Sequence, residues 1–406
     1  MKIFEAPNRK SIADANAVDT LLNRNVEEVF VREELRKKLL SGRPLRVKLG
    51  FDPTSSQIHI GRAITLWKLR ELQDLGHEAI FILGDFTARI GDPSDKLSKR
   101  PMLTDKEIEN NVKTYKEQVA KIVDIKKAEF HFNSLWLSKM PMKEMVALAE
   151  SFSIQQMSGR RNFKERFRRG DEVSLREFLY PLFQGYDSVA IKADVEIGGF
   201  DQLFNLKAGR TVQRHFGMTE QDVLTTKMLL GTDGRKMSSS WGNIINITDQ
   251  PKEMFGKIMS LRDNLIGDYF TLCTEISEVE SLKISAALQD GKTNPRDLKL
   301  ELAEKIVARY WGESKAKDAG LEFEKVFGKG GSPQEIATVE VKKGTLLYEI
   351  VFNNRMVSSK SEWQRLVKSG AVDYVGGGEV TDYKATADSS GDLRIGKKRF
   401  LRIVVK

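Results

Sequence analysis

Two short clusters of residues combine cations with glycine in a way that suits phosphate chemistry, and the second also carries hydroxyl groups. The first is His59-Ile60-Gly61-Arg62, which follows a predicted strand and turn and opens a predicted helix. A helix start offers free backbone N–H groups and a partial positive charge, and Gly61 lets a large ligand approach the backbone. His59 and Arg62 are three residues apart, so both can face the same anion. The alternative is an ordinary helix start with a surface histidine and arginine.

The second cluster runs from Gly234 to Ser240, where a turn precedes two cations and three hydroxyl groups. Such a loop can wrap a phosphate chain, and Lys236 would act in it as a point charge. Taken alone, this pattern is also that of a solvated surface loop.

A third group of polar residues shares one face of a predicted helix, because Tyr180, Gln184 and Asp187 are spaced i, i+4 and i+7. This face is polar within an otherwise apolar segment, which indicates either a substrate contact or a buried hydrogen-bonded cluster. Pro181 is awkward inside a helix, so we expect it to mark the first turn or a kink.

Asp201 follows two glycines at the end of another predicted strand. A carboxylate at that place can accept hydrogen bonds from both hydroxyls of a ribose, and Gly198 and Gly199 allow close approach. The alternative is simple capping of the following helix by Asp201, and both roles can hold at once.

The elements that must position these residues predict an α/β domain. Residues 44–51 and 78–85 are apolar strands, and the helical pattern between them makes a βαβ unit, which requires a parallel sheet. A third strand is predicted at 194–197. The segment 159–170 carries six Arg or Lys around two phenylalanines, and it is either a contact for nucleic acid phosphates or a solvated helix face.

The pattern along the chain predicts four parts: an α/β domain at 1–245 with a helical insert at about 131–190, a helical segment at 246–327, a linker at 328–343 and a compact α+β module at 344–406. The last part has 11 Lys and Arg against 7 Asp and Glu, so it is basic.

The composition excludes several classes of protein. The 406 residues include one cysteine, which excludes an internal disulfide framework and a cysteine-based zinc site, and the four histidines lack ligand spacing. No apolar run is long enough to span a bilayer, and residues 1–17 lack the apolar stretch of a signal peptide. We therefore expect a cytoplasmic protein without a membrane contact. The net charge of +9 fits a polyanionic partner such as nucleic acid.

The first two clusters together resemble the HIGH and KMSKS motifs of class I aminoacyl-tRNA synthetases, in the right order. Five further motifs resemble the tyrosyl-tRNA synthetases, in the bacterial subclass whose first strand reads KLG: Gly50–Thr54, Gly84–Thr87, Ile90–Ser94, Tyr180–Asp187 and Ile197–Gln202. The C-terminal part, with Val357–Glu362 and Val367–Val372, resembles an S4 RNA-binding domain. The resemblance, which runs from about Leu21 to Lys406, implies a Rossmann-like parallel-sheet catalytic domain, an α-helical anticodon-binding domain and an S4-like domain.

The resemblance also implies a reaction and its residues. The chain would activate L-tyrosine with ATP, release pyrophosphate, and transfer the tyrosine to the 3′ end of tRNA(Tyr). Mg²⁺ is expected with ATP, no protein-bound metal is expected, and the family is homodimeric through the helical insert. His59, Arg62 and Lys236 would be catalytic. ATP would be bound by Asp52, Thr54, His59, Gly61, Arg62, Gly199, Asp201, Lys236 and Ser239. Tyrosine would be bound by Asp92, Tyr180, Gln184, Asp187 and Gln202. Lys96 and Arg100 resemble residues that touch pyrophosphate.

Three positions depart from the usual family pattern. Arg62 stands where most members have the second histidine of HIGH, and Ser239 stands where many have the second lysine of KMSKS. Lys48 occupies the place of a tyrosine that touches the substrate hydroxyl in the other bacterial subclass. The resemblance therefore implies that the hydroxyl is read mainly by Asp187.

Two alternatives remain at this point. One is the related tryptophanyl enzyme, against which Asp187 and the S4-like tail argue. The other is an RNA-binding or intron-splicing protein that has lost catalysis. The residues that argue against it are the retained His59, Lys236, Asp92, Gln184 and Asp201.

Overall fold

The structure is a computed structural model that describes residues 10–94, 102–238, 241–290, 293–327, 336–375, 377–396 and 399–406. Lys96, Arg100 and Ser239 lie outside the described residues. The chain divides into two compact units, namely Met1–Asp249 with Ser260–Leu302, and Gln250–Met259 with Ala303–Lys406. The helical segment that we predicted as one part at 246–327 is therefore shared between the two units.

A six-stranded sheet in the order β1-β6-β5-β2-β3-β4 forms the centre of the first unit. Its strands are β1 (Val26–Phe30), β2 (Arg46–Phe51), β3 (Glu78–Leu83), β4 (Glu129–Phe132), β5 (Val195–Gly199) and β6 (Asp222–Thr226). β2 to β6 are parallel, which confirms the predicted parallel sheet, while the edge strand β1 runs antiparallel to β6. Since the central strands are covered on both faces, most of their residues are buried.

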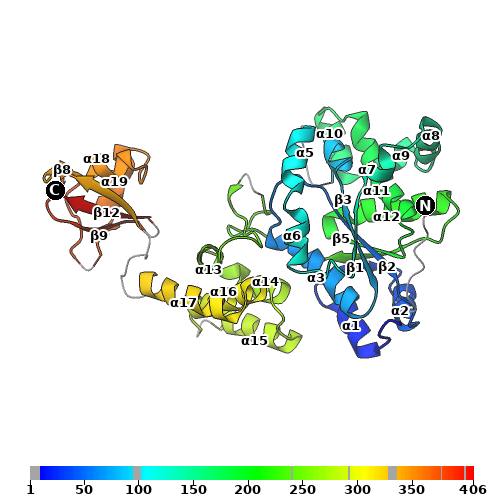
Figure 1. Cartoon of the computed structure of the whole chain (residues 1–406), viewed down its shortest axis with the longest axis horizontal. Coiled ribbons are helices and arrows are strands. Elements are labelled where there is room, and N and C mark those ends of the chain that lie inside the picture. Colours follow the sequence, from blue (N-terminus) through cyan, green and yellow to red (C-terminus); the bar gives the residue numbers. More distant parts are fainter. Residues whose placement is uncertain are drawn as a thin grey trace. The chain divides into compact units, whose positions relative to one another are not determined.

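Helices cover both faces of this sheet. Figure 1 shows α3 and α6 on one side of it and α11 and α12 on the other. The helices outside the insert are α1 (Ala15–Asn23), α2 (Arg32–Leu40), α3 (Ile60–Asp74), α4 (Thr87–Ile90), α5 (Asp105–Val112), α6 (Tyr115–Ala120) and α12 (Leu203–His215), preceded by the 3-10 turn η1 (Phe200–Gln202). The carboxyl ends of β2, β3 and β5 lead into α3, α4 and η1, so the motifs at these three places meet at one edge of the sheet.

The insert contains α7 (Ser134–Leu137), α8 (Met142–Glu150), α9 (Ile154–Ser158), α10 (Arg161–Arg169) and α11 (Leu175–Ala190). α11 begins at Leu175 because Ser174 and Glu177 form a capping box. Pro181 is thus the seventh residue of the helix, which excludes the first turn and leaves a kink as the other predicted alternative. Its missing N–H leaves the carbonyl of Glu177 without the usual helical partner, while the Glu177 carboxylate is held at 2.8 Å by the buried Arg166.

The first unit also holds η3 (Asp263–Leu265), α14 (Ile266–Cys273), α15 (Glu278–Gln289) and the first part of α16 (Pro295–Trp311). The second unit contains α13 (Pro251–Met259) and α17 (Glu313–Phe327), which pack together through Phe255 and Phe323. Helix α16 starts at Pro295, where proline is well tolerated because the first helical N–H needs no partner.

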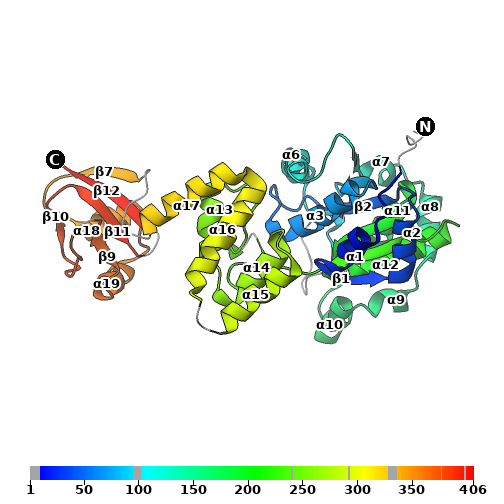
Figure 2. The ribbon, with the colours of Figure 1, turned by 90° about the horizontal axis from the view of Figure 1, so that it is seen from below.

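The C-terminal module is α+β, as predicted. A sheet in the order β7-β12-β11-β9 lies beside α18 (Leu347–Asn353) and α19 (Lys360–Lys368), as Figure 2 shows. Its strands are β7 (Ala337–Val341), β9 (Val372–Tyr374), β11 (Gly391–Ile395) and β12 (Arg399–Val405), and β8 (Thr345–Leu346) pairs with β10 (Thr386–Ala387). The prediction of a linker up to 343 is wrong for 337–341. This segment pairs in parallel with β12, which gives its backbone groups partners.

None of the helices in the described ranges is long and apolar enough to span a membrane.

Candidate active site

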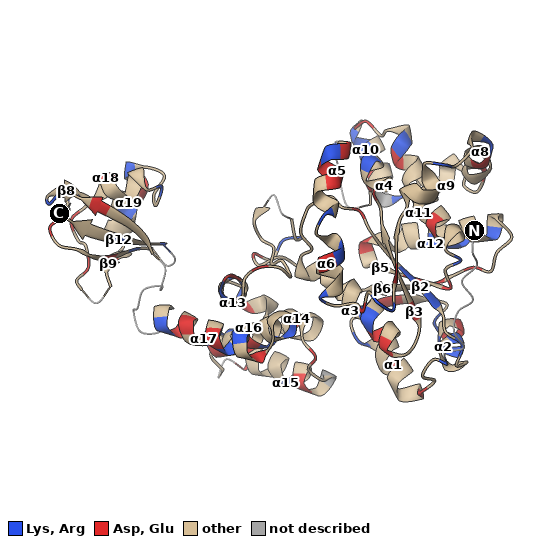
Figure 3. Ribbon diagram, in the orientation of Figure 1, with Lys and Arg blue, Asp and Glu red and all other residues tan. Residues whose placement is uncertain are grey.

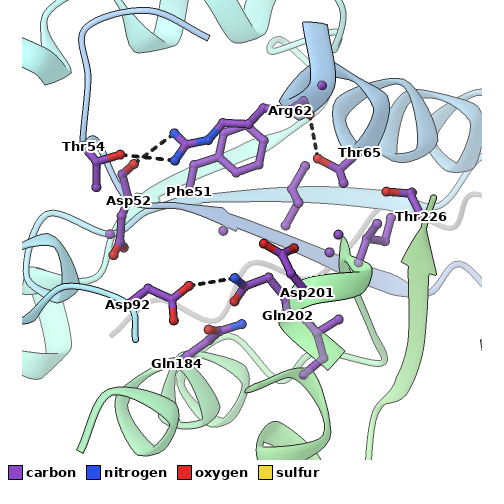
Figure 4. Close-up of a pocket in the computed structure, with 18 of the residues that line it drawn as sticks. Phe51, Asp52, Thr54, Arg62, Thr65, Asp92, Gln184, Asp201, Gln202 and Thr226 are labelled. Carbon is purple, nitrogen blue, oxygen red and sulfur yellow. Dashed lines mark hydrogen bonds between the residues drawn. The ribbon is translucent and has the colours of Figure 1, made fainter. Parts of the chain in front are cut away.

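A cavity of about 260 Å³ opens at the carboxyl ends of the parallel strands. The strand ends supply its floor, and α3, α11, η1 and the 234–238 loop supply its walls. Each predicted site residue in the described part of the chain lines it: Asp52, Thr54, His59, Gly61, Arg62, Asp92, Tyr180, Gln184, Asp187, Gly199, Asp201, Gln202 and Lys236. Figure 4 shows two ends of this cavity, with Arg62 and Thr54 at one and Asp92, Gln202 and Gln184 at the other.

Asp92 is the most firmly held carboxylate at its end of the cavity. Its Oδ2 atom accepts a hydrogen bond of 2.7 Å from Gln202 Nε2, and its Oδ1 atom accepts from Ser94 N at 2.9 Å and Asn205 Nδ2 at 3.3 Å. These neutral donors fix the carboxylate without neutralising it. A fixed negative charge beside a cavity suits a cationic group such as an ammonium.

Asp187, which lines the cavity from α11, is 4% exposed. Trp136 Nε1 donates to its Oδ1 atom at 2.8 Å, and Asn133 Nδ2 donates to its Oδ2 atom at 3.3 Å. Burial raises the pKa of Asp187 to about 7, and the charge of Lys48 and these two donors oppose that rise. Trp136 and Asn133 come from the insert, and sequence reasoning missed both because no local pattern marks them.

Asp52 joins the two ends of the cavity. Its carboxylate accepts hydrogen bonds from Tyr180 Oη at 2.9 Å and Thr87 Oγ1 at 2.7 Å, and burial raises its pKa to about 6. Gly84 makes this contact possible, since a Cβ atom there would lie 2.1 Å from the Asp52 carboxylate. The Asp52 side chain therefore contacts a residue predicted for tyrosine, although Asp52 itself was predicted for ATP.

His59 caps α3 through its ring, because Nδ1 accepts a hydrogen bond of 3.3 Å from the Arg62 N–H. Burial lowers the pKa of His59 to about 3, and the charges of Arg62 and Lys236 act in the same direction. The ring is thus neutral and keeps one N–H donor. The permanent positive charge of this cluster resides on Arg62, whose guanidinium donates to Thr54 Oγ1 at 3.2 Å and to Tyr115 Oη at 3.4 Å.

The 234–238 loop packs against the start of α3. A Cβ atom on Gly61 would lie 2.8 Å from Met237 Sδ, so the glycine admits the loop as well as a ligand. Lys236 Nζ lies 3.3 Å from Asp201 Oδ2, which brings the second cluster to the predicted ribose carboxylate. Residues 59–62 and 236, far apart in sequence, therefore lie at the same end of the cavity, where Arg62 and Lys236 supply two cations.

The basic run at 159–170 divides into buried and exposed cations. Arg166 is fully buried on Glu177, and Arg160 is buried against Ser94 Oγ at 2.9 Å and Asn205 Oδ1 at 3.0 Å. Arg168 and Arg169 remain open to solvent near the end of α10, where Figure 3 shows basic residues. Arg166 thus holds two parts of the insert together, and Arg160 attaches the insert to Ser94 and Asn205, which also hydrogen-bond to Asp92.

Comparisons with known proteins identify the family of this chain. The family model described as tRNA synthetases class I (W and Y) matches residues 40–328. A tyrosine–tRNA ligase of Thermotoga maritima is 45% identical over 94% of this chain and 96% of its own length. One from Aromatoleum aromaticum is 43% identical over 97% of this chain and 100% of its own length.

The chain belongs to the tyrosyl-tRNA synthetases. It is a class I aminoacyl-tRNA synthetase of bacterial type, as the sequence motifs indicated. The crystal structure of the Archaeoglobus fulgidus tyrosyl-tRNA synthetase complexed with L-tyrosine is similar in fold, with a TM-score of 0.61. It is 25% identical to this chain, covering 76% of this chain and 100% of that chain. The names of these full-length relatives argue against the tryptophanyl alternative and against a protein that has lost catalysis.

Proposed function

We propose that the cavity binds L-tyrosine with its phenol group at Asp187 and its ammonium group at Asp92. The observation that carries this proposal is a pair of carboxylates that line the same cavity with different exposure: Asp187 is 4% exposed, whereas Asp92 is half-buried. Tyr180 and Gln184 flank the space between them, and Gln202 holds Asp92 in place. A phenol needs an acceptor deep in the cavity, and an ammonium needs a fixed negative charge.

ATP enters the other end of the cavity as its magnesium complex. Asp201 accepts the ribose hydroxyls beside Gly199, whose lack of a side chain leaves room for close approach. The phosphates lie between the start of α3, with Thr54 and Gly61 nearby, and Lys236. Lys96, Arg100 and Ser239 remain candidates for the pyrophosphate end.

The tyrosine carboxylate attacks the α-phosphate, a phosphorus–oxygen bond forms, and pyrophosphate leaves. The 3′-terminal ribose hydroxyl of the tRNA then attacks the tyrosyl carbonyl, and AMP leaves. Neutral His59 donates a hydrogen bond to the phosphates, whereas Arg62 and Lys236 supply positive charge. Most of the rate enhancement comes from positioning and from this fixed charge.

Pyrophosphate exchange that depends on tyrosine tests this function. We expect exchange with L-tyrosine and a much weaker signal with L-tryptophan. Exchange that favours tryptophan would contradict the amino acid assignment, and no exchange with any amino acid would contradict the reaction.

The ratio of exchange efficiency (kcat/KM) with L-tyrosine to that with L-phenylalanine should rise as the pH goes from about 6 to about 8. Asp187 has a pKa of about 7 and loses its proton over this range. The ionised carboxylate accepts a stronger hydrogen bond from a phenol, and it is costlier to leave unpaired beside phenylalanine. Burial also raises the pKa of Asp52, to about 6. Its carboxylate accepts from Tyr180 and Thr87 and from neither donor of Asp187, so we expect its effect to be equal for both amino acids and to cancel in the ratio. A ratio that stays flat or falls would contradict the role of Asp187.

The raised pKa of Asp187 also predicts how the stability of the fold depends on pH. Because the folded chain holds the Asp187 proton more tightly than the unfolded chain, the protonated carboxyl stabilises the fold at low pH, and that stability is lost as the pH rises through about 7. The Asp187→Asn variant should lack this component in its pH dependence of thermal unfolding.

The C-terminal module binds tRNA(Tyr). Arg355, Lys360, Arg365 and Lys368 are exposed on or beside α18 and α19, which gives this module a basic surface. A chain that ends after Phe327 should form tyrosyl-adenylate at the normal rate and lose at least about tenfold in kcat/KM for tRNA, since one of two linked contacts is removed. Single-turnover activation and aminoacylation measure the two steps. Normal aminoacylation by the shortened chain would show that the module makes no productive RNA contact.

The chain forms a homodimer through the insert. Leu135, Met142, Val146 and Ile154 expose apolar side chains on α7, α8 and α9, a concentration that a second subunit would cover. The cytoplasmic location stays a prediction from the sequence.

A further inference from the structure

A charged pair lies buried beneath the cavity. The register of β2 and β5 places Lys48 directly beside Glu196, and their side chains are 0% and 1% exposed with 2.9 Å between Nζ and Oε1. Burying such a pair costs desolvation energy, and apolar residues of similar volume often serve the fold as well or better. The contacts of Lys48 and Glu196 therefore indicate what the pair does beyond packing.

Lys48 uses all of its hydrogen-bond donors inside the protein. Besides Glu196, its Nζ atom donates to the main-chain oxygen of Gln184 at 2.7 Å and to Ser188 Oγ at 2.8 Å. An ammonium has three N–H donors, so none is left for a phenol oxygen. Lys48 thus does not replace the tyrosine that touches the substrate hydroxyl in the other bacterial subclass.

Glu196 also contacts Gln184, at its side-chain amide. Its Oε1 atom accepts a hydrogen bond of 3.1 Å from Gln184 Nε2, and its Oε2 atom accepts from Ser188 and Gln221. Gln184 is therefore held at two places. Lys48 donates to its main-chain oxygen, and Glu196 accepts from its side-chain amide. With the NH₂ group of the amide turned to the carboxylate, the carbonyl oxygen is the polar atom that remains for the cavity.

We propose that Lys48 and Glu196 are positioning residues that orient the Gln184 amide, so that its oxygen accepts a hydrogen bond from the substrate ammonium. This inference rests on the proposed placement of the ammonium near Gln184. An ammonium can only donate, and an amide turned the other way would face it with N–H groups. The charge on Glu196 makes the favourable orientation the lower in energy, because a carboxylate can accept from the amide but cannot donate to it.

Two double variants separate orientation from packing. Lys48→Met/Glu196→Leu removes both charges and also removes the acceptor for Gln184 Nε2. Lys48→Met/Glu196→Gln removes both charges but keeps an acceptor oxygen at position 196. The new amide also brings an NH₂ group. Gln221 can turn to accept from this group, because its Oε1 atom has no hydrogen-bond partner among the described residues. Neither variant leaves an unpaired buried charge, so both should fold, which thermal unfolding checks.

The measurement is calorimetric binding of L-tyrosine and of desaminotyrosine, the analogue without the amino group. In Lys48→Met/Glu196→Leu, the affinity for L-tyrosine should fall about tenfold, as expected for losing one charge-assisted hydrogen bond, while the affinity for desaminotyrosine stays within about twofold. Lys48→Met/Glu196→Gln should retain most of the affinity for L-tyrosine. Equal losses for both ligands would show a merely structural role and overturn the inference.

Gln184→Ala distinguishes this inference from the proposed function. Suppose that Gln184→Ala lowers the affinity for L-tyrosine more than that for desaminotyrosine, but Lys48→Met/Glu196→Leu does not. The ammonium is then placed correctly, and the positioning role is wrong. If Gln184→Ala changes the affinities for the two ligands equally, the ammonium lies elsewhere. Both the placement at Gln184 and the positioning role then fail.

Discussion

Replacing Asp187 by asparagine should weaken the binding of L-tyrosine by about 1.5–3 kcal/mol, or roughly 10- to 150-fold, and change the binding of L-phenylalanine much less. In the proposed placement of the substrate, the phenol meets the Asp187 carboxylate, and Lys48 has no donor left to share that task. Rejection of phenylalanine by a pocket that pairs the hydroxyl is already known for tyrosyl-tRNA synthetases. We propose that Asp187 carries this discrimination here.

Asparagine is the cleaner substitution because it keeps the shape of the side chain between Trp136 and Asn133. Asp187→Ala should lower the affinity for tyrosine at least as much, but α11 could shift when the side chain is removed. Asp222→Asn is a matched control, since Asp222 is also a buried carboxylate, but it starts β6 at the opposite end of the strand and pairs with Lys38. Pyrophosphate exchange with both amino acids measures the preference. If Asp187→Asn keeps the wild-type preference, the hydroxyl is read elsewhere.

Replacing Lys236 by alanine should slow the formation of tyrosyl-adenylate by about 10²–10³-fold and leave the binding of L-tyrosine within about twofold. In the structure Lys236 lies on Asp201, at the ribose end of the cavity, and ATP offers it a more highly charged partner. Its interaction with the phosphates should therefore develop as the loop closes, and it should be strongest in the transition state. Single-turnover activation kinetics and tyrosine titration separate the two effects.

Arg235→Ala provides the matched control for this prediction. Arg235 precedes Lys236 on the same loop, but its guanidinium stacks 4.6 Å from the Trp241 ring centre and pairs with Asp233. Its removal should change the activation rate by less than about fivefold, in line with the small contribution of an exposed ion pair. Equal losses in the two variants would mean that the loop matters as a structure and that Lys236 makes no specific phosphate contact.

The parallel sheet and the cavity could be predicted because their signals are local. Apolar strands end in glycine, aspartate or threonine, and the carboxyl ends of parallel strands must meet at one edge. The short edge strands β1 and β4, with the sequences VEEVF and EFHF, carry no comparable pattern. Their strand conformation depends on pairing with β6 and β3, which tertiary contacts decide.

The internal partners of the site could not be predicted for the same reason. Asp52 accepts a hydrogen bond from Tyr180, which lies 128 positions later in the chain. Arg166 stands in a basic run typical of a protein surface, and only the fold places Glu177 against it. Lys48 alternates with apolar residues in a strand, so its sequence position marks a buried site but not the acceptors that satisfy it. Motifs identify residues that contact a substrate, whereas the residues that orient them depend on the fold.

A crystal structure of the protein with bound L-tyrosine tests the central claim most directly. We predict the phenol oxygen within about 2.5–3.0 Å of an Asp187 carboxylate oxygen, and the ammonium within hydrogen-bond distance of both Asp92 and the Gln184 side-chain oxygen. Lys48 should keep its three protein acceptors in that complex. A phenol oxygen bound to Lys48, or a tyrosine turned so that its ammonium meets Asp187, would contradict this account.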